Sequence, residues 1–178
     1  MKMKEICARS GLTERAVRLY CERGLVHPEK RWERGREYLE FSDHNLRELT
    51  IGSGVTNIGY EAFSGCDSLE SITVDEKNTA YKDIDGNLYT KDGNTLIQYP
   101  IGKKATSFTI PDSVTSIGMY AFSWSSSLKS IKLSKSIKEI PNGMFNYCTL
   151  LTDVVIPDSV KSIESDAFRY CRSLTEIN

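Results

Sequence analysis

The chain has 178 residues, a formal net charge of −1, and 39% hydrophobic and 26% charged residues. This length allows one domain or two small ones, and a composition near the globular average excludes collagen-like, coiled-coil and disordered chains. No apolar run approaches the roughly 18 residues of a membrane helix, and the N-terminal residues lack the apolar stretch of a secretory signal, so we expect a cytoplasmic protein with reduced cysteines.

The small net charge hides an uneven distribution along the chain. Residues 1–36 carry ten Lys and Arg against five Glu, whereas residues 37–178 carry 13 basic against 19 acidic residues. A basic head on an acidic body predicts two units. Nucleic acid is a candidate partner for the head only.

Residues 1–45 form the head, and the spacing of their apolar residues predicts two short helices. Ser10-Gly11-Leu12 is typical of a turn, and Thr13 and Gly24 are typical of the beginning and end of the second helix. Two short helices joined by a Gly-containing turn form the motif whose second helix enters the DNA major groove. The basic stretch around Gly35 is expected to be a hairpin wing that lies along a phosphate backbone.

The head resembles the N-terminal half of the MerR-type winged helix-turn-helix family. The residues that carry this resemblance are Ser10-Gly11-Leu12-Thr13, Val17-Arg18-Leu19-Tyr20, Arg23-Gly24-Leu25, Pro28, Gly35-Arg36-Glu37-Tyr38 and Phe41-Ser42-Asp43. The resemblance implies binding to double-stranded DNA, with Arg15 facing base edges from the recognition helix. Arg18 and Tyr20 would contact phosphates from that helix, and Arg36 would do so from the wing.

Most of the remaining chain is an internal repeat with a period of 23 residues. Ile110-Pro-Asp-Ser-Val-Thr-Ser-Ile117 recurs 46 positions later as Ile156-Pro-Asp-Ser-Val-Lys-Ser-Ile163. Each unit reads L-x-x-I-x-[I/V/L], V-x-x-I and then A-F, which predicts a short strand, a second extended segment and an aromatic residue in the centre of a coil. One unit cannot bury these faces alone, so the units are expected to stack into a solenoid.

The pattern I-P-D-S-V-x-x-I-x-x-x-A-F-x-x-C-x-x-L resembles the bacterial BspA-type leucine-rich repeat over residues 46–178. We therefore predict an α+β protein, in which a small helical winged helix-turn-helix-like head precedes a β-rich leucine-rich-repeat solenoid with 23-residue repeats. The strand positions on the concave side are mostly small and hydroxylic, which suits a broad protein-contact surface. These positions are Thr50, Thr73, Thr109, Lys132 and Val155.

An insertion over about residues 75–104 interrupts the repeats. The apolar segments on either side of Lys91-Asp-Gly-Asn94 predict a hairpin with Asp-Gly turn chemistry. The segment Asp83-Ile-Asp-Gly-Asn87 resembles the start of a calcium-binding loop. It lacks the Gly at position six and the Glu at position twelve of such loops, so a polar turn is the better interpretation.

Cys66, Cys148 and Cys171 occupy one repeat position, where Ser125 stands in another unit. A metal or redox site would need two of them to converge, whereas stacking in a ladder would make each a small buried hydrophobe, which is the interpretation we favour. Trp124 fits two roles equally well, an exposed contact for a partner or a local plug of the coil.

The sequence shows no catalytic constellation. Its two histidines, His27 and His44, lack a metal-ligand spacing partner, and there is no nucleophile elbow or phosphate-cradling loop, so we expect no enzyme activity, metal or cofactor. The leading hypothesis is a bacterial DNA-binding transcriptional regulator whose repeats bind an unknown protein or mediate self-association as a homo-oligomer. The alternative is a protein-interaction scaffold that does not bind DNA, in which the head caps the N-terminal end of the solenoid.

Overall fold

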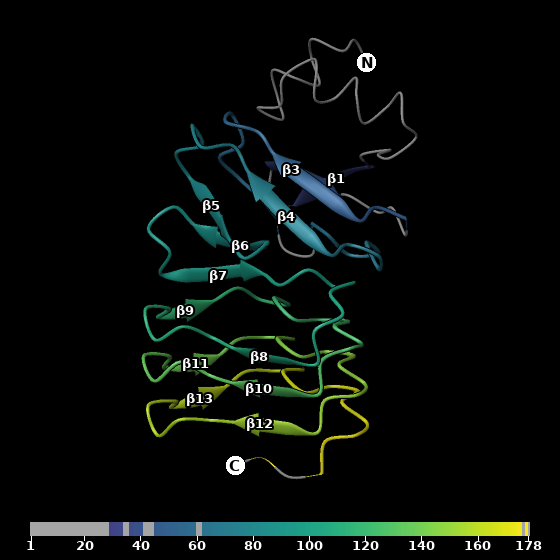
Figure 1. Cartoon of the computed structure of the whole chain (residues 1–178), viewed down its shortest axis with the longest axis vertical. Coiled ribbons are helices and arrows are strands. Elements are labelled where there is room, and N and C mark those ends of the chain that lie inside the picture. The colour runs from purple at the N-terminus through teal and green to yellow at the C-terminus, as the bar shows by residue number, and fades with distance from the viewer. Residues whose placement is uncertain (1–28, 34–35, 41–44, 60–61, 176, 178) are drawn as a thin grey trace.

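A computed structural model describes residues 29–33, 36–40, 45–59, 62–175 and 177, and most of these residues form a stack of β-coils (Figure 1). The strands are β1 (Glu29–Glu33), β2 (Arg36–Glu40), β3 (Glu48–Ile51), β4 (Ser71–Val74), β5 (Tyr81–Ile84), β6 (Asn87–Thr90), β7 (Thr95–Gln98), β8 (Ser107–Thr109), β9 (Ser116–Ile117), β10 (Ser130–Lys132), β11 (Glu139–Ile140), β12 (Asp153–Val155) and β13 (Ser162–Ile163). The described residues contain no helix long and apolar enough to cross a membrane.

Parallel pairing in a 23-residue register builds the coils. Glu48 of β3 pairs with Ser71 of β4, and Ser107, Ser130 and Asp153 form one row across β8, β10 and β12. Because each partner lies one repeat further along the chain, every repeat position stacks on itself in the next coil. The leucine-rich-repeat solenoid predicted from the 23-residue period is therefore present.

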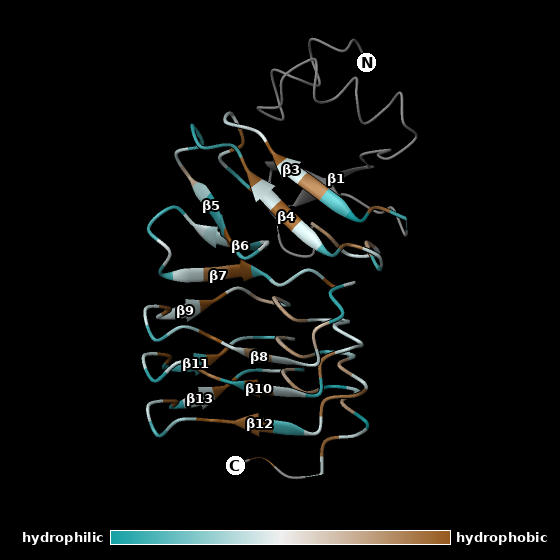
Figure 2. Cartoon of the chain, viewed as in Figure 1, coloured by the Kyte–Doolittle hydropathy of each residue, from teal (hydrophilic) through white to brown (hydrophobic). Residues whose placement is uncertain are grey.

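Apolar side chains fill the interior of the coils in two clusters, one between Leu46 and Leu88 and one between Tyr89 and Ala167. Figure 2 shows the alternation of polar and apolar residues along β3 and β4 that sends one side of each strand inward. The second cluster contains a row of rings that we call the inner ladder: Tyr99, Phe122, Phe145 and Phe168, with successive centroids 5.1, 5.5 and 5.3 Å apart. Aromatic contacts of this kind stabilise a core by about 0.5–1.5 kcal/mol beyond burial.

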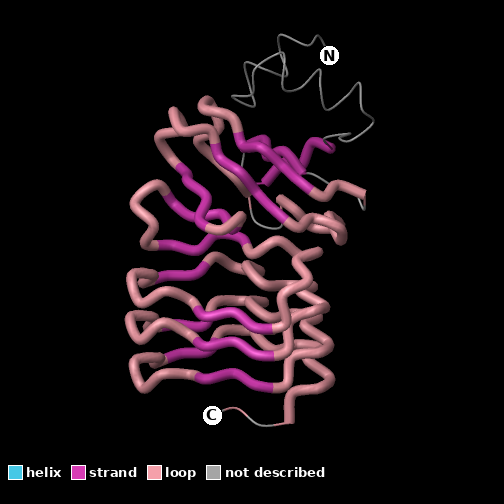
Figure 3. The backbone as a smooth tube through the Cα atoms, viewed as in Figure 1, coloured by secondary structure: helices cyan, strands magenta, loops and turns pink. Residues whose placement is uncertain are grey.

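The predicted α+β class is wrong for the described residues, which contain strands and turns but no helix (Figure 3). The structure is instead a β-solenoid of leucine-rich-repeat type. Both helices predicted for the head lie outside the described residues.

The segment that contains the Ala-Phe pair of each repeat forms turns, and its backbone explains why no helix forms there. Tyr120 and Trp124 have φ values of 58° and 63°, and left-handed residues four positions apart interrupt a right-handed helix. The N–H group of Trp124 donates to the carbonyl of Asn146 at 2.8 Å, and that of Tyr147 donates to Arg169 at 2.9 Å. These N–H groups therefore bond to the next coil, whereas in a helix they would bond four residues back.

Strands β1 and β2 pair antiparallel, with Glu33 opposite Arg36. This pairing confirms the hairpin predicted around Gly35. Its role as a wing on DNA stays a prediction.

The insertion forms an antiparallel arrangement of β5, β6 and β7, and β7 joins the solenoid by pairing in parallel with β9. Strands β6 and β7 form the hairpin predicted around Asp92-Gly93, and Gly93 has the left-handed φ of 81° that its turn needs.

Asn78 holds the start of the insertion against the first coil. Its side chain is 1% exposed, its Nδ2 donates to the carbonyls of Gly52 and Val55 at 2.8 and 2.9 Å, and its Oδ1 accepts from the N–H groups of Ala80 and Tyr81 at 2.8 and 2.7 Å. One side chain thus satisfies four backbone groups across two coils.

Replacing Asn78 by Ala should lower the free energy of unfolding by about 3 kcal/mol, because four backbone groups lose a partner and each hydrogen bond contributes about 0.5–1.5 kcal/mol. Urea denaturation followed by circular dichroism measures this change. The matched control is Asn57→Ala at an exposed position, for which we expect a change within about 0.5 kcal/mol. Equal effects of the two substitutions would contradict the assigned role of Asn78.

Candidate functional site

Of the residues predicted to contact DNA, Arg15, Arg18 and Tyr20 lie outside the described residues. Arg36 is the first residue of β2, where it pairs with Glu33. The hairpin therefore places Arg36 next to the connection between β1 and β2. Its phosphate contact stays a prediction.

The residues predicted to face a partner protein are all exposed, and we call them the strand face. Thr109, Lys132 and Val155 form one register row across β8, β10 and β12. Thr50 and Thr73 pair across β3 and β4, which form a separate sheet. The structure thus brings the five residues together as two groups and not as one continuous row.

The strand face combines hydroxyl, charged and apolar groups. The Oγ1 atoms of Thr50 and Thr73 lie 2.9 Å apart, within hydrogen-bonding distance. In the other group, the register row joins a hydroxyl group, an ammonium group and the exposed methyl groups of Val155. The protein contact predicted for these residues stays a prediction.

The thiols of Cys148 and Cys171 act as hydrogen-bond donors. The Sγ of Cys148 donates to the carbonyl of Phe122 and the Sγ of Cys171 to that of Phe145, both at 3.0 Å and both in the preceding coil. This arrangement supports the structural interpretation of Cys66, Cys148 and Cys171, which we call the cysteine column. The described residues contain no group of three or more His, Cys, Asp and Glu that could hold a metal ion.

Where Ser125 replaces Cys in this column, the equivalent backbone carbonyl has a different donor. The carbonyl that its hydroxyl would meet by analogy belongs to Tyr99, and the Nε2 of Gln98 already donates to that carbonyl at 2.8 Å. The buried Oγ of Ser125 has no hydrogen-bond partner within the described residues. The replacement of Cys by Ser thus coincides with a different donor to the same backbone group.

The segment Asp83-Ile-Asp-Gly-Asn87 is a turn. Asp85 and Gly86 have φ values of 51° and 73° and connect β5 to β6 as a two-residue hairpin loop. The Oδ1 of Asp83 accepts the N–H of Val74 at 2.8 Å, so this carboxylate is used in holding the hairpin against β4. These contacts support the polar-turn interpretation.

Three exposed or half-buried aromatic residues form a second row, which we call the outer ladder: Trp124, Tyr147 and Tyr170. The ring centroids of Trp124 and Tyr147 lie 3.9 Å apart with an interplanar angle of 5°, and those of Tyr147 and Tyr170 lie 4.4 Å apart. Trp124 is 48% exposed, so the interpretation as a plug is wrong and that as an exposed residue holds. The 23-residue spacing of the three rings is a sequence signal that the interpretation of Trp124 alone missed.

The thiol groups of the cysteine column should resist alkylation in the folded protein. Burial raises the pKa of Cys148, and burial raises the pKa of Cys171 to about 11. Since the thiolate is the reactive form, both cysteines should react slowly with iodoacetamide at about pH 8, and Cys171 should become reactive first as the pH approaches 11. Peptide mass spectrometry distinguishes the two sites, and the urea-unfolded chain, in which both should react at similar rates, is the control. Rapid labelling of Cys148 in the folded chain at pH 8 would contradict this prediction.

Comparison with known proteins separates the two ends of the chain. The family described as MerR HTH family regulatory protein matches residues 1–60. The chain is 35% identical to the HTH-type transcriptional regulator CueR of Salmonella typhi over 60 residues. This aligned segment covers 34% of this chain and 42% of that protein. The chain thus matches less than half the length of this curated relative.

The repeats have relatives among solved structures. The pneumococcal vaccine antigen PcpA aligns with a TM-score of 0.62 and 30% identity, over 66% of this chain and 29% of that one. A leucine rich cell surface protein of Faecalibacterium prausnitzii aligns with a TM-score of 0.59 and 34% identity, over 74% of this chain and 41% of that one. The family described as BspA type Leucine rich repeat region matches in six copies over residues 37–91 and 101–178. With this match and the 23-residue stacking of its coils, the chain belongs to the BspA-type leucine-rich repeat family.

Proposed function

We propose that this protein is a bacterial, cytoplasmic transcriptional regulator whose head binds double-stranded DNA and whose repeats bind a protein. The observation that carries the proposal is the match of the MerR HTH family to residues 1–60, together with 35% identity to a named transcriptional regulator over 60 residues. The proposed role is one of binding, without catalysis, metal or cofactor.

The charge and pairing of the head support DNA binding. Its first 36 residues carry ten basic side chains against five acidic ones, and phosphate contacts from such residues supply most non-specific affinity for DNA. The antiparallel pairing of β1 and β2 gives the basic stretch the shape expected of a wing.

The repeats support protein contact and self-association. The strand face is exposed and chemically mixed. A dimer formed through this face would present two heads to two half-sites, the geometry that helix-turn-helix proteins use.

A scaffold without DNA binding is the second candidate. It is favoured by the position of Leu46, which is 2% exposed and begins the apolar core directly after the head. The terminal coil of a solenoid needs a cover, and the head adjoins that coil in sequence. In this case Arg15 and Arg18 would stabilise the fold and not contact DNA.

Fluorescence anisotropy of a labelled duplex, titrated with the full chain at several salt concentrations, separates the two candidates. We expect non-specific binding with a dissociation constant of roughly 10⁻⁴–10⁻⁶ M that weakens with salt. The Arg15→Ala/Arg18→Ala variant should bind more weakly, and its log–log salt slope should flatten by about 0.9 for each phosphate that the variant no longer neutralises.

The matched control is Lys135→Ala/Lys138→Ala, which removes the same charge from exposed positions in the repeats and should leave binding nearly unchanged. Circular dichroism of all three chains verifies equal folding. Absence of binding at low salt, or equal weakening in the two double variants, would reject the DNA-binding head and favour the scaffold.

A further inference from the structure

The outer ladder stops at Trp124 because the preceding coils carry no ring at its position. Trp124 lies four residues before Leu128, and the residues at this place in the two preceding units are Ile101 and Gly65. Ile101 is only 6% exposed, so its side chain is directed into the protein, and Gly65 has no side chain. Space therefore remains beside the indole ring of Trp124 on the side of these coils.

This space is a notch of about 500 Å³ lined by Ser64, Gly65, Asp67, Ile101, Trp124 and Ser126. Tyr147 of the following coil covers one face of the Trp124 indole at 3.9 Å. The opposite face is turned toward the preceding coils and hence toward the notch. Among the described residues of this lining, Asp67 carries a charge, and Ser64 and Ser126 supply hydroxyl groups.

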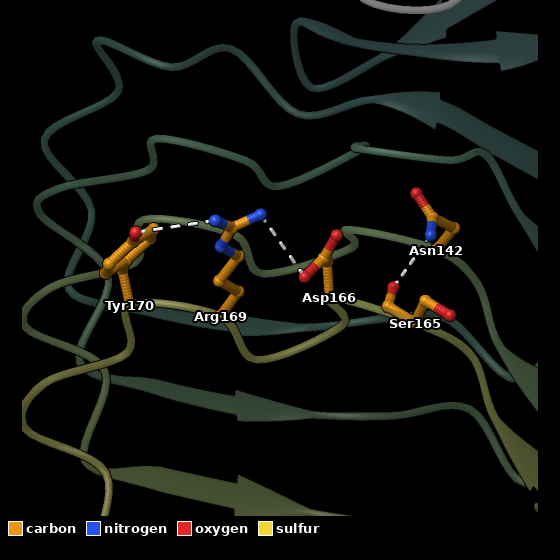
Figure 4. Close-up of polar contacts among 5 residues, drawn as sticks. All are labelled: Asn142, Ser165, Asp166, Arg169 and Tyr170. Carbon is orange, nitrogen blue, oxygen red and sulfur yellow. Dashed lines mark hydrogen bonds and ion pairs between the residues drawn. The ribbon is translucent and has the colours of Figure 1, made fainter.

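Cations of the same chain cover the ends of both ladders elsewhere. At the far end of the outer ladder, the guanidinium carbon of Arg169 lies 5.0 Å from the ring centroid of Tyr170, and the Nη2 of Arg169 lies 3.4 Å from its hydroxyl oxygen. The Nη1 of Arg169 also lies 3.5 Å from Asp166 (Figure 4). At the start of the inner ladder, the Nζ of Lys103 lies 5.3 Å from the centroid of Tyr99. Among the described residues, no lysine or arginine is placed in this way over Trp124.

We propose that the notch binds a guanidinium group, supplied by an arginine side chain of a partner protein. The planar guanidinium would stack on Trp124, the aromatic residue that attracts cations most strongly, and would pair with the carboxylate of Asp67. Its remaining N–H groups find acceptors in the hydroxyls of Ser64 and Ser126. This arrangement of ring, guanidinium and carboxylate is the one that Tyr170, Arg169 and Asp166 form within the chain.

The inference rests on the proposed protein binding by the repeats, and it adds a site outside the strand face. It does not depend on DNA binding by the head, because every residue involved lies in the repeats. A chain that fails in the anisotropy experiment can therefore still bind arginine, and the two failures are distinguishable.

Nuclear magnetic resonance of the full chain with ¹⁵N-labelled tryptophan tests the site. The chain has two tryptophans, Trp32 and Trp124, so the spectrum holds two indole N–H signals, which a Trp32→Phe variant assigns. The probes are blocked arginine and blocked citrulline, which has the same shape without the charge. Arginine should shift the Trp124 signal in a saturable way in the millimolar range, while the Trp32 signal stays in place. Citrulline should shift the Trp124 signal much less.

Asp67→Asn should weaken arginine binding about two- to fivefold, the range that corresponds to one exposed ion pair. The matched control is Asp158→Asn at another exposed position of the repeats, which should leave the titration unchanged. Equal shifts with arginine and citrulline, parallel shifts of both indole signals, an unaltered titration in Asp67→Asn, or no shift at all would each overturn the proposal. The comparison of the two probes needs no variant, so it holds even if a substitution disturbs folding.

Discussion

Parallel backbone pairing in a register of one repeat is the constraint on which the rest of the structure depends. When β8, β10 and β12 align Ser107 with Ser130 and Asp153, every other repeat position is forced to stack on its own equivalent. A ring then lies on a ring, a thiol on the next cysteine, and a turn on a turn. The inner ladder, the cysteine column and the outer ladder are three results of a single register.

Such stacking turns small local choices into features of the whole surface. An aromatic residue at one turn position gives a column of rings, as in the outer ladder, and a glycine or a buried aliphatic residue at the same position leaves a notch beside that column. The strand face follows the same logic, because one outward position per repeat pairs Thr50 with Thr73 and aligns Thr109, Lys132 and Val155. Recognition by this protein therefore depends on which side chains are placed in the few positions that face outward.

The sequence was sufficient for features that repeat and insufficient for those that depend on contacts between unlike coils. The 23-residue period predicted the solenoid, and Asp92-Gly93 and Gly35 predicted the two hairpins. The α+β class was wrong for the described residues because its helical part rested on the head alone, whose two predicted helices lie outside them, and the described repeats contain only strands and turns. The four hydrogen bonds of Asn78 and the hydrogen bond from Gln98 to the Tyr99 carbonyl were also missed. Both arise where the insertion meets a coil of different sequence, so no repeat pattern signals them.

The bonds that join one turn to the next have a consequence for how the protein can change in length. Trp124 bonds to Asn146 and Tyr147 to Arg169, so each turn is completed by the same groups of its successor. Gain or loss of a whole 23-residue coil by gene duplication or deletion would preserve these bonds and both ladders, whereas any other length would break the phase. The insertion lengthens one step of the repeat, from Leu69 to Ala105, by 13 residues, and it avoids this by folding into an antiparallel arrangement whose last strand, β7, pairs in parallel with β9 and so rejoins the solenoid. In evolution, therefore, the solenoid is free to grow or shrink in whole coils, and additions of other lengths are restricted to excursions of this kind.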